Sequence, residues 1–205
     1  YLGVVVQRIV YELRGISCLD LDKVLPKKNI MCSRSFGNPV NSKAIIKDFI
    51  TEYAIRATEK VRQQNSRAQG IYIFLQTNRF RKEKQYSSGI MFGLNSPSCD
   101  TSIIIKLALR AIDQIYQSGY SYHKAGIMML DLIPSEIHQQ DLFQNTNYLL
   151  SDQRMGVIDF LNNKYGSGTI THGKIRQKDK SRWKSKSFYL SPRYTTQWDE
   201  LPQVS

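Results

Sequence analysis

The order of hydrophobic patterns between residues 29 and 132 limits the possible folds of this chain more than any other feature. Residues 42–64 carry apolar side chains at helical spacing, and a second helical pattern runs from about Asp100 to Gly119. Apolar and β-branched runs typical of strands precede, separate and follow these two helices. The strand candidates are 29–36, 71–77, 86–94 and 124–132.

These segments predict an α+β domain with the element order β-α-β-β-α-β. Each helix has a single apolar stripe, so we expect both helices on one face of a four-stranded antiparallel sheet. The other sheet face is left open. The side of the first helix opposite its apolar stripe carries Lys47, Glu52, Glu59 and Arg62.

Two further segments flank this domain. Residues 4–14 predict a short leading helix, and residues 151–165 could form a helix with Met155, Ile158 and Leu161 facing inward. The sequence beyond residue 165 is basic and aromatic with weak periodicity, so we expect a loosely structured basic C-terminal region.

The charge of the chain indicates an anionic partner. Lys and Arg outnumber Asp and Glu by 29 to 17, and the pI is about 9.6, which favours nucleic acid over a membrane surface. No run approaches the about 18–20 apolar residues of a membrane span, and the first residues lack the layout of a signal peptide. We therefore expect a cytoplasmic protein that does not contact membranes. A helical pattern that opens without Met predicts a start inside a longer polypeptide.

No motif for catalysis or metal binding stands out. Cys18, Cys32 and Cys99 are scattered and have no histidine at ligand spacing, so we expect reduced, structural cysteines and no metal. Asp20 and Asp22 could hold a divalent ion beside a third carboxylate, but no such residue or Gly-rich phosphate loop accompanies them. Solvated residues after a helix are the preferred interpretation.

Basic side chains gather near the first strand and between the two central strands: Lys27, Lys28, Arg34, Arg79, Arg81, Lys82 and Lys84. They could line one edge of the sheet and contact phosphates, and a solvated surface is the simpler alternative. An RNA-recognition module of similar topology is less favoured, because residues 71–77 lack the aromatic pattern of that module.

A polar stretch near residue 140 contains an adjacent Leu-Phe pair. The pentapeptide QQDLF, residues 139–143, matches Q-x-[SD]-L-F, the peptide by which bacterial polymerases and repair proteins hold the sliding clamp. Leu142 and Phe143 would be the apolar anchors, with Gln139 and Asp141 as polar contacts. The alternative is that the pair folds back on its own domain as a satellite cluster.

Six segments taken together resemble one protein family. They are VVVQRIVYELRG with Cys18, MCSRSFG, AIRATEKVR, SYHKAGIMMLDL, QQDLF and FYLSPRYTT. In this order, and over nearly the whole chain, they resemble the C-terminal part of the UmuC, ImpB, MucB and SamB group of Y-family translesion DNA polymerases. The resemblance implies four regions: the end of the thumb with a linker (1–28), the DNA-binding little finger (29–132), a linker with the clamp peptide (133–150) and a C-terminal region of the UmuC type (151–205).

The resemblance also implies a division of labour. The Mg²⁺-binding carboxylates of the family lie in a palm domain, and no residue of this chain matches them, so no catalytic residue and no cofactor are expected here. The chain would hold DNA and dock on the clamp for an error-prone polymerase of SOS DNA repair and damage tolerance. The implied phosphate contacts are Lys28, Ser33, Arg34, Ser35, Arg79, Arg81 and Lys82.

The resemblance leaves two questions open. The C-terminal region could bind a UmuD′ dimer or a RecA filament, and a basic tail that contacts DNA is an equal candidate. A free-standing regulator that occupies DNA or the clamp without a polymerase is the alternative function. Palm carboxylates upstream of Tyr1 would distinguish the polymerase from the regulator.

Overall fold

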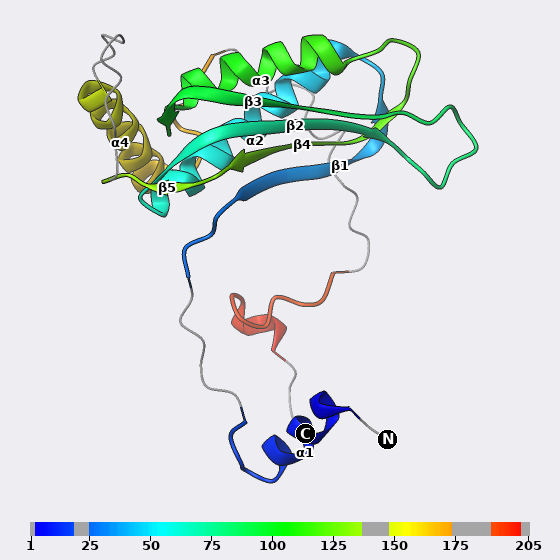
Figure 1. Ribbon diagram of the computed structural model, residues 1–205, viewed down its shortest axis with the longest axis vertical. Helices are drawn as coiled ribbons and strands as arrows, with labels where there is room; N and C mark the ends of the chain where they lie inside the picture. Colours follow the sequence, from blue (N-terminus) through cyan, green and yellow to red (C-terminus); the bar gives the residue numbers. More distant parts are fainter. Residues whose placement is uncertain (1–2, 19–24, 137–147, 174–189, 202–205) are drawn as a thin grey trace.

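A computed structural model describes residues 3–18, 25–136, 148–173 and 190–201. The middle part follows the predicted order β-α-β-β-α-β and confirms the α+β class (Figure 1). Its elements are β1 (Ile30–Val40), α2 (Lys43–Gln63), β2 (Ser66–Thr77), β3 (Ser87–Ser98), α3 (Thr101–Ile115) and β4 (Tyr122–Leu130). Outside it lie α1 (Val4–Leu13), β5 (Ile133–Pro134), α4 (Tyr148–Tyr165) and the 3₁₀ helix η1 (Trp198–Glu200).

The main sheet has the strand order β1-β4-β2-β3, and all neighbours are antiparallel. β2 and β4 are therefore central, and β1 and β3 are the edges. The short β5 pairs with Ser66 and Arg67 at the start of β2, so the sheet has a fifth strand that the sequence did not predict. A two-residue strand has no readable periodicity, which is why this part of the predicted linker from 133 to 150 read as a connection.

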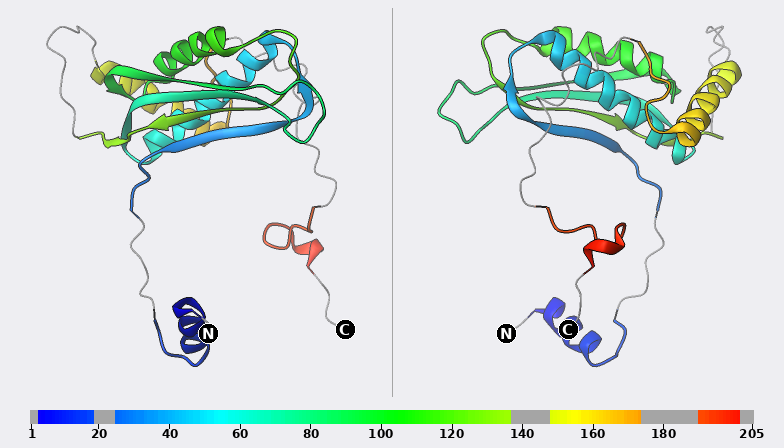
Figure 2. Two further views of the ribbon diagram at one scale, coloured as in Figure 1. Left: turned by 45° about the vertical axis from the view of Figure 1, so that its right-hand side comes forward. Right: turned by 180° about the vertical axis from the view of Figure 1, so that it is seen from behind.

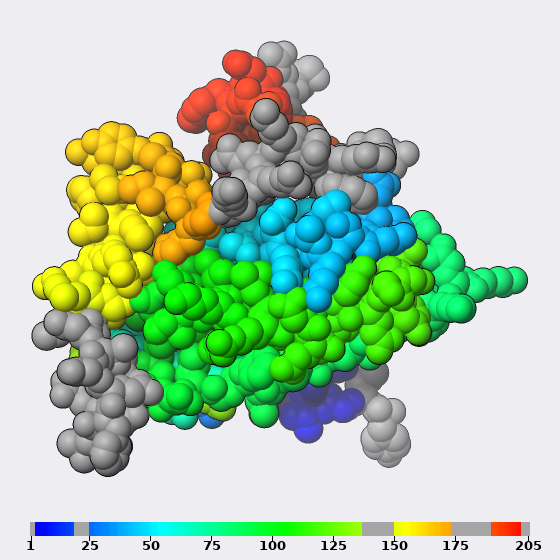
Figure 3. Space-filling view, turned by 90° about the horizontal axis from the view of Figure 1, so that it is seen from above, coloured from blue at the N-terminus to red at the C-terminus, as the bar shows by residue number. Residues whose placement is uncertain are grey.

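The hydrophobic core fills the space between the sheet and one pair of helices. Ile71, Ile73 and Leu75 of β2 and Ile127 and Met129 of β4 are fully buried beneath α2 and α3. Alanines at the buried positions of both helices let them pack closely on this layer. Figure 2 shows both helices on the same face of the sheet, and Figure 3 looks down on them from the helix side.

The start of α3 is fixed by capping and by a buried polar contact. The Asp100 carboxylate accepts a hydrogen bond from the Ser102 N–H at 2.7 Å, as an N-cap residue does. The hydroxyls of Thr58 on α2 and Thr101 on α3 lie 2.9 Å apart and are both buried. This contact ties the two helices together beneath the end of the sheet where α4 packs.

α4 packs at the end of the sheet opposite the β2–β3 connection (Figures 1 and 2). It begins three residues before the predicted helix, and Met155 is almost completely buried, as predicted, while Ile158 and Leu161 are half-buried. Arg62 of α2 donates two hydrogen bonds to the Asp159 carboxylate, at 2.6 and 2.7 Å. The sequence placed Arg62 opposite the apolar stripe of α2 but did not show this contact, because the partner lies 97 residues away in the sequence.

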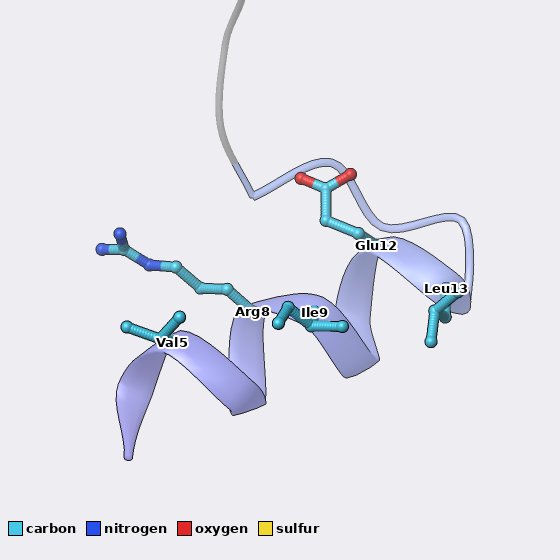
Figure 4. A pocket seen from close by; sticks show the side chains of 5 residues that line it. All are labelled: Val5, Arg8, Ile9, Glu12 and Leu13. Atoms are coloured by element: carbon cyan, nitrogen blue, oxygen red, sulfur yellow. The ribbon is translucent and has the colours of Figure 1, made fainter. Parts of the chain in front are cut away.

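The leading helix α1 is the predicted amphipathic element, and none of its residues is buried. Val5, Ile9 and Leu13 project along one side of it and line a shallow hollow with Arg8 and Glu12 (Figure 4). All five side chains come from this one helix. The Glu12 carboxylate accepts a hydrogen bond from the Cys18 N–H at 2.7 Å. This bond links the last turn of the helix to the segment that follows it.

Candidate nucleic-acid interface

The sheet face opposite α2 and α3 is the candidate site. Because side chains alternate between the two faces of a strand, every second residue of β1, β2, β3 and β4 projects onto this face. The strand register groups these residues into four cross-strand rows. They are Leu130–Gly70–Gly93, Met31–Met128–Tyr72–Met91, Ser33–Gly126–Phe74–Gly89 and Ser35–Lys124–Gln76–Ser87. We call this surface the open face.

The open face is flat because glycines flank its aromatic side chains. Phe74 lies opposite Gly126 on β4 and Gly89 on β3, and its ring centroid is 6.0 Å from that of Tyr72. A Cβ at Gly126 would come within 2.6 Å of the Phe74 ring, and one at Gly89 within 2.2 Å of the Tyr72 hydroxyl. The two rings therefore lie over these glycines and fill the space that larger side chains would need.

The chemistry of the open face changes along the strands. The two rows nearest the start of β1 are mostly apolar, while the row Ser35–Lys124–Gln76–Ser87 is polar and carries a positive charge. The Lys124 Nζ lies 5.9 Å from the centre of the Phe74 ring, a cation–π distance. No side chain in the four rows is acidic. A surface with hydroxyls, an amide, one cation and no carboxylate suits a phosphate backbone.

The β2–β3 connection, residues 78–86, extends this polar end away from the sheet (Figure 1). Gln85 holds the connection in shape, because its Nε2 donates to the carbonyl oxygens of Arg81 at 2.7 Å and Asn78 at 3.0 Å. Arg79, Arg81 and Lys82 are exposed. Arg81 makes one long contact with Glu83, 3.4 Å between exposed side chains, which contributes little. The connection thus adds exposed cations beside Lys124.

The structure divides the three candidates on β1 between two faces. Ser33 and Ser35 lie on the open face, opposite Gly126 and Lys124 of β4. Arg34 lies opposite Ala125 and projects to the other face, beside α2. Its charge there acts on the hydroxyl of Tyr53, whose pKa burial raises to about 12. Adjacent strand residues project to opposite faces, so the open face presents Ser33 and Ser35 but not Arg34.

Of the remaining predicted residues, one lies at the margin of the sheet and the others lie outside the described ranges. Lys28 is exposed just before β1, and its carbonyl accepts a hydrogen bond from the Leu132 N–H at 2.9 Å. Gln139, Asp141, Leu142 and Phe143 lie outside the described residues, as do Asp20 and Asp22.

Neither a metal-ligand cluster nor a membrane-spanning helix is found in the described parts of the chain. Within residues 3–18, 25–136, 148–173 and 190–201, no three acidic, cysteine or histidine side chains come together as metal ligands would. No helix within the same ranges has the length and apolar character needed to cross a membrane.

Sequence reasoning missed Lys124, the cation at the centre of the polar row. The alternation in KAGIMM carried a usable signal, since Lys124, Gly126 and Met128 share one face of a strand whose other residues are apolar. The sequence patterns did not show which side of the strand would be covered by helices.

Comparison with protein families gives two matches along the chain. Residues 27–142 match the impB/mucB/samB family C-terminal domain, and residues 153–204 match a domain of unknown function, DUF4113. The second match begins within α4. The family resemblance inferred from the sequence is thereby confirmed.

Similar curated proteins cover the whole chain. Protein UmuC of Salmonella typhimurium (strain LT2) is 36% identical over 100% of this chain and 49% of its own length. Protein ImpB of Salmonella typhimurium is 35% identical over 98% of the chain and 47% of its own length, and Protein MucB of Escherichia coli is 32% identical over the same shares. The chain therefore spans about half the length of these relatives.

A solved structure described as an insertion ternary complex of Dbh DNA polymerase is also similar. It is 15% identical, with a TM-score of 0.40 over 63% of this chain and 35% of its own.

Proposed function

Because the chain belongs to the impB/mucB/samB family, we propose that it is the DNA-holding and clamp-docking portion of an error-prone translesion DNA polymerase that acts in SOS DNA repair. The observation that carries the DNA-holding part is the open face, a flat surface without carboxylates that ends in Lys124 and the basic β2–β3 connection. In this proposal the Mg²⁺-binding carboxylates belong to a palm domain outside this chain.

A duplex lies along the open face with its backbone against the small side chains. Ser33 and Ser35 donate hydrogen bonds to phosphate oxygens, and Lys124 with Arg79 and Arg81 supplies charge. Such contacts position the duplex without reading its sequence. A polymerase that copies damaged templates needs this property, because a grip that depends on intact bases would fail at the lesion.

Two neighbouring cations on opposite sheet faces provide the test. Lys124→Ala removes a charge from the open face, whereas Arg34→Ala removes one from the helix side of the adjacent strand. With a blunt duplex, Lys124→Ala should weaken binding about equally across sequences. It should also reduce the slope of log affinity against log salt by about 0.9, the value for one lost phosphate contact.

Arg34→Ala is the matched control and should leave both the affinity for the blunt duplex and the salt slope unchanged. Fluorescence anisotropy at several salt concentrations measures both quantities. A Lys124→Ala variant with wild-type affinity and slope, or equal losses in the two variants, would contradict the open-face assignment.

The clamp-docking part of the proposal rests on the QQDLF peptide. Leu142 and Phe143 enter an apolar groove on the sliding clamp, with Gln139 and Asp141 as polar contacts. Two such anchors bind at micromolar strength, and attachment of the same chain to DNA raises the effective affinity.

Replacing both Leu142 and Phe143 with Ala tests this. The double variant should lose clamp binding, since truncating an anchor in a desolvated pocket costs about 2 kcal/mol or more, and its melting temperature should stay close to wild type. A stability loss of about 2–5 kcal/mol with intact clamp affinity would show instead that the pair packs on its own domain.

The partners of the C-terminal part complete the proposal. A UmuD′ dimer and RecA are the candidates, and residues 153–204 carry the family-level match that is separate from the sheet domain. A pull-down of the chain against clamp, UmuD′ and RecA, with and without DNA, tests each contact separately. Capture of neither UmuD′ nor RecA in the presence of DNA would remove them from the proposal.

A further inference from the structure

A polar groove lies at the start of β1, on the free edge of the sheet. It has a volume of about 670 Å³ and is open to solvent. Lys27 and Lys60 line it together with three side-chain amides and the side chains of Ile30 and Met31. No carboxylate lines the groove, so its chemistry suits an anion.

Hydrogen bonds fix the wall that carries Lys27. Gln64, the residue just after α2, accepts a hydrogen bond from the Lys27 N–H at 3.0 Å and donates one to the Lys27 carbonyl at 2.9 Å. The side chain of Asn29 accepts a hydrogen bond from the Asp131 N–H at 2.9 Å. These contacts hold the segment before β1 against α2, so the backbone at Lys27 is set in place beside Lys60.

More positive charge continues along the β1 edge from the groove. Burial raises the pKa of the Cys32 thiol, while the charges of Lys60, Arg56 and Arg34 act to lower it. Arg56 makes one ion pair, 2.8 Å with Glu52, and it is 44% exposed. The groove and these cations form a basic track on the helix side of β1.

The groove is also continuous with the open face. Met31 lines the groove and occupies the apolar row of the open face beside Met128. A nucleic-acid strand on the open face can therefore pass over the start of β1 and reach Lys27 and Lys60 without leaving the protein surface.

We propose that this groove binds the backbone of a single-stranded nucleic-acid segment that leaves the duplex on the open face. The inference rests on the proposed function and adds a second contact surface to it. Lys27 and Lys60 contact phosphates, the amides of Asn29 and Gln63 donate to phosphate or sugar oxygens, and Met31 contacts a sugar or base edge.

The shape of the path selects a single strand over a duplex. A duplex is stiff over about 150 base pairs and cannot turn around the edge of a sheet, whereas a single strand bends freely. Sites that track a single strand combine a positively charged groove with sequence tolerance. With no aromatic side chain in its lining, the groove gives contacts that depend on salt and not on base identity.

The experiment compares three fluorescent probes: a blunt duplex, the same duplex with a short dT extension on one strand, and a free dT oligonucleotide. The extension should strengthen binding to the wild-type chain. It should also steepen the slope of log affinity against log salt by about 1.4, since each single-strand phosphate contributes about 0.7.

Lys27→Ala/Lys60→Ala is the test variant and Lys106→Ala/Arg110→Ala the control. The control removes the same charge from exposed positions on α3. The test variant should lose both the gain from the extension and the added slope, while its affinity for the blunt duplex stays unchanged. The control variant should keep the gain.

Different results would contradict the groove inference and the proposed function. A wild-type chain that binds the blunt duplex but gains nothing from the extension overturns the groove inference and leaves the proposed function intact. A chain that binds only free dT, through Lys27 and Lys60, keeps the groove and overturns duplex binding on the open face. A polyglutamate peptide that binds at these lysines while dT does not would assign the groove to an acidic protein segment and overturn the inference.

Discussion

The arginines at the α4 end of the domain and the cations around the open face differ in what balances their charge. Arg62 binds Asp159 through two hydrogen bonds, Arg67 pairs with Asp152, and Arg154 pairs with Asp100. Lys124 and Arg79 make no ion pair within the described parts of the chain. Both groups contribute to the same excess of positive charge, but Lys124 and Arg79 have no neutralising carboxylate there and can bind an outside anion. Net charge alone therefore cannot locate a nucleic-acid site.

Burial and hydrogen bonds hold the charged side chains at the α4 end of the domain in place. Arg62 reaches Asp159 from a side chain that is only 12% exposed, and its third nitrogen donates to the Cys99 carbonyl and the Thr101 hydroxyl at 2.9 Å each. Burial opposes ionisation of Asp100, but hydrogen bonds from Ser151 and the Ser102 N–H outweigh it and lower the pKa of that carboxyl. The family match that ends at residue 142 and the one that begins at residue 153 therefore meet across a packed interface.

The largest expected effect comes from removing the central arginine of this interface. Arg62→Ala leaves the partly buried Asp159 carboxylate without its partner and should lower the free energy of unfolding by about 3 kcal/mol, the lower end for a buried pair. Urea denaturation measures the loss. Affinity for a blunt duplex should not change, because the open face is untouched.

Arg154→Ala is the control for this prediction. Its side chain is 60% exposed, so its removal should cost less than about 1 kcal/mol. Similar losses in the two variants would mean that the Arg62 pair is not a central contact of α4.

A smaller effect is expected from Gly126→Ala on the open face. The new Cβ would lie 2.5 Å from the Ser33 Cβ and 2.6 Å from the Phe74 ring, so the ring must move, at a cost of about 1–3 kcal/mol. Because the surface is no longer flat, affinity for the blunt duplex should fall as well.

Gly93→Ala is a matched control on the same face, since nothing lies within 4 Å of a Cβ at that position. Thermal denaturation and anisotropy should place this variant near wild type. If Gly126→Ala binds duplex as well as Gly93→Ala does, flatness is not needed for binding.

The smallest effect concerns pH. Burial lowers the pKa of His172 below its usual value of 6.5, in the neighbourhood of Asp100, Arg62, Arg154 and Asp159. The unfolded chain then binds the proton more readily, so stability present above about pH 6.5 is lost as pH falls through the lower folded pKa. The urea midpoint should decrease slightly from about pH 7 to about pH 5, and His172→Gln should flatten that decrease. An identical pH dependence in both proteins would exclude His172 as its source.

Local sequence patterns predicted the order of the helices and strands. Features that depend on contacts between distant residues could not be predicted from these patterns. The helical stripes and the apolar strands are properties of neighbouring residues, so the six elements of the domain were predictable. Arg34 and Ser33 looked equivalent in sequence, but the sheet separates them because alternate residues face opposite sides. The ion pair of Arg62 could not be predicted from its helix, because the carboxylate that binds it lies on α4. The sequence predicted that one sheet face would stay uncovered, but not that Lys124 would project onto that face.

The five methionines allow a direct test of the central claim that the open face holds DNA. Met31, Met91 and Met128 lie on the open face, Met129 is buried in the core and Met155 is a buried residue of α4. In a chain with ¹³C-labelled methionine methyl groups, titration with a blunt duplex should shift the signals of the first three and leave the other two in place. Saturated binding with the three open-face signals unchanged would contradict the account.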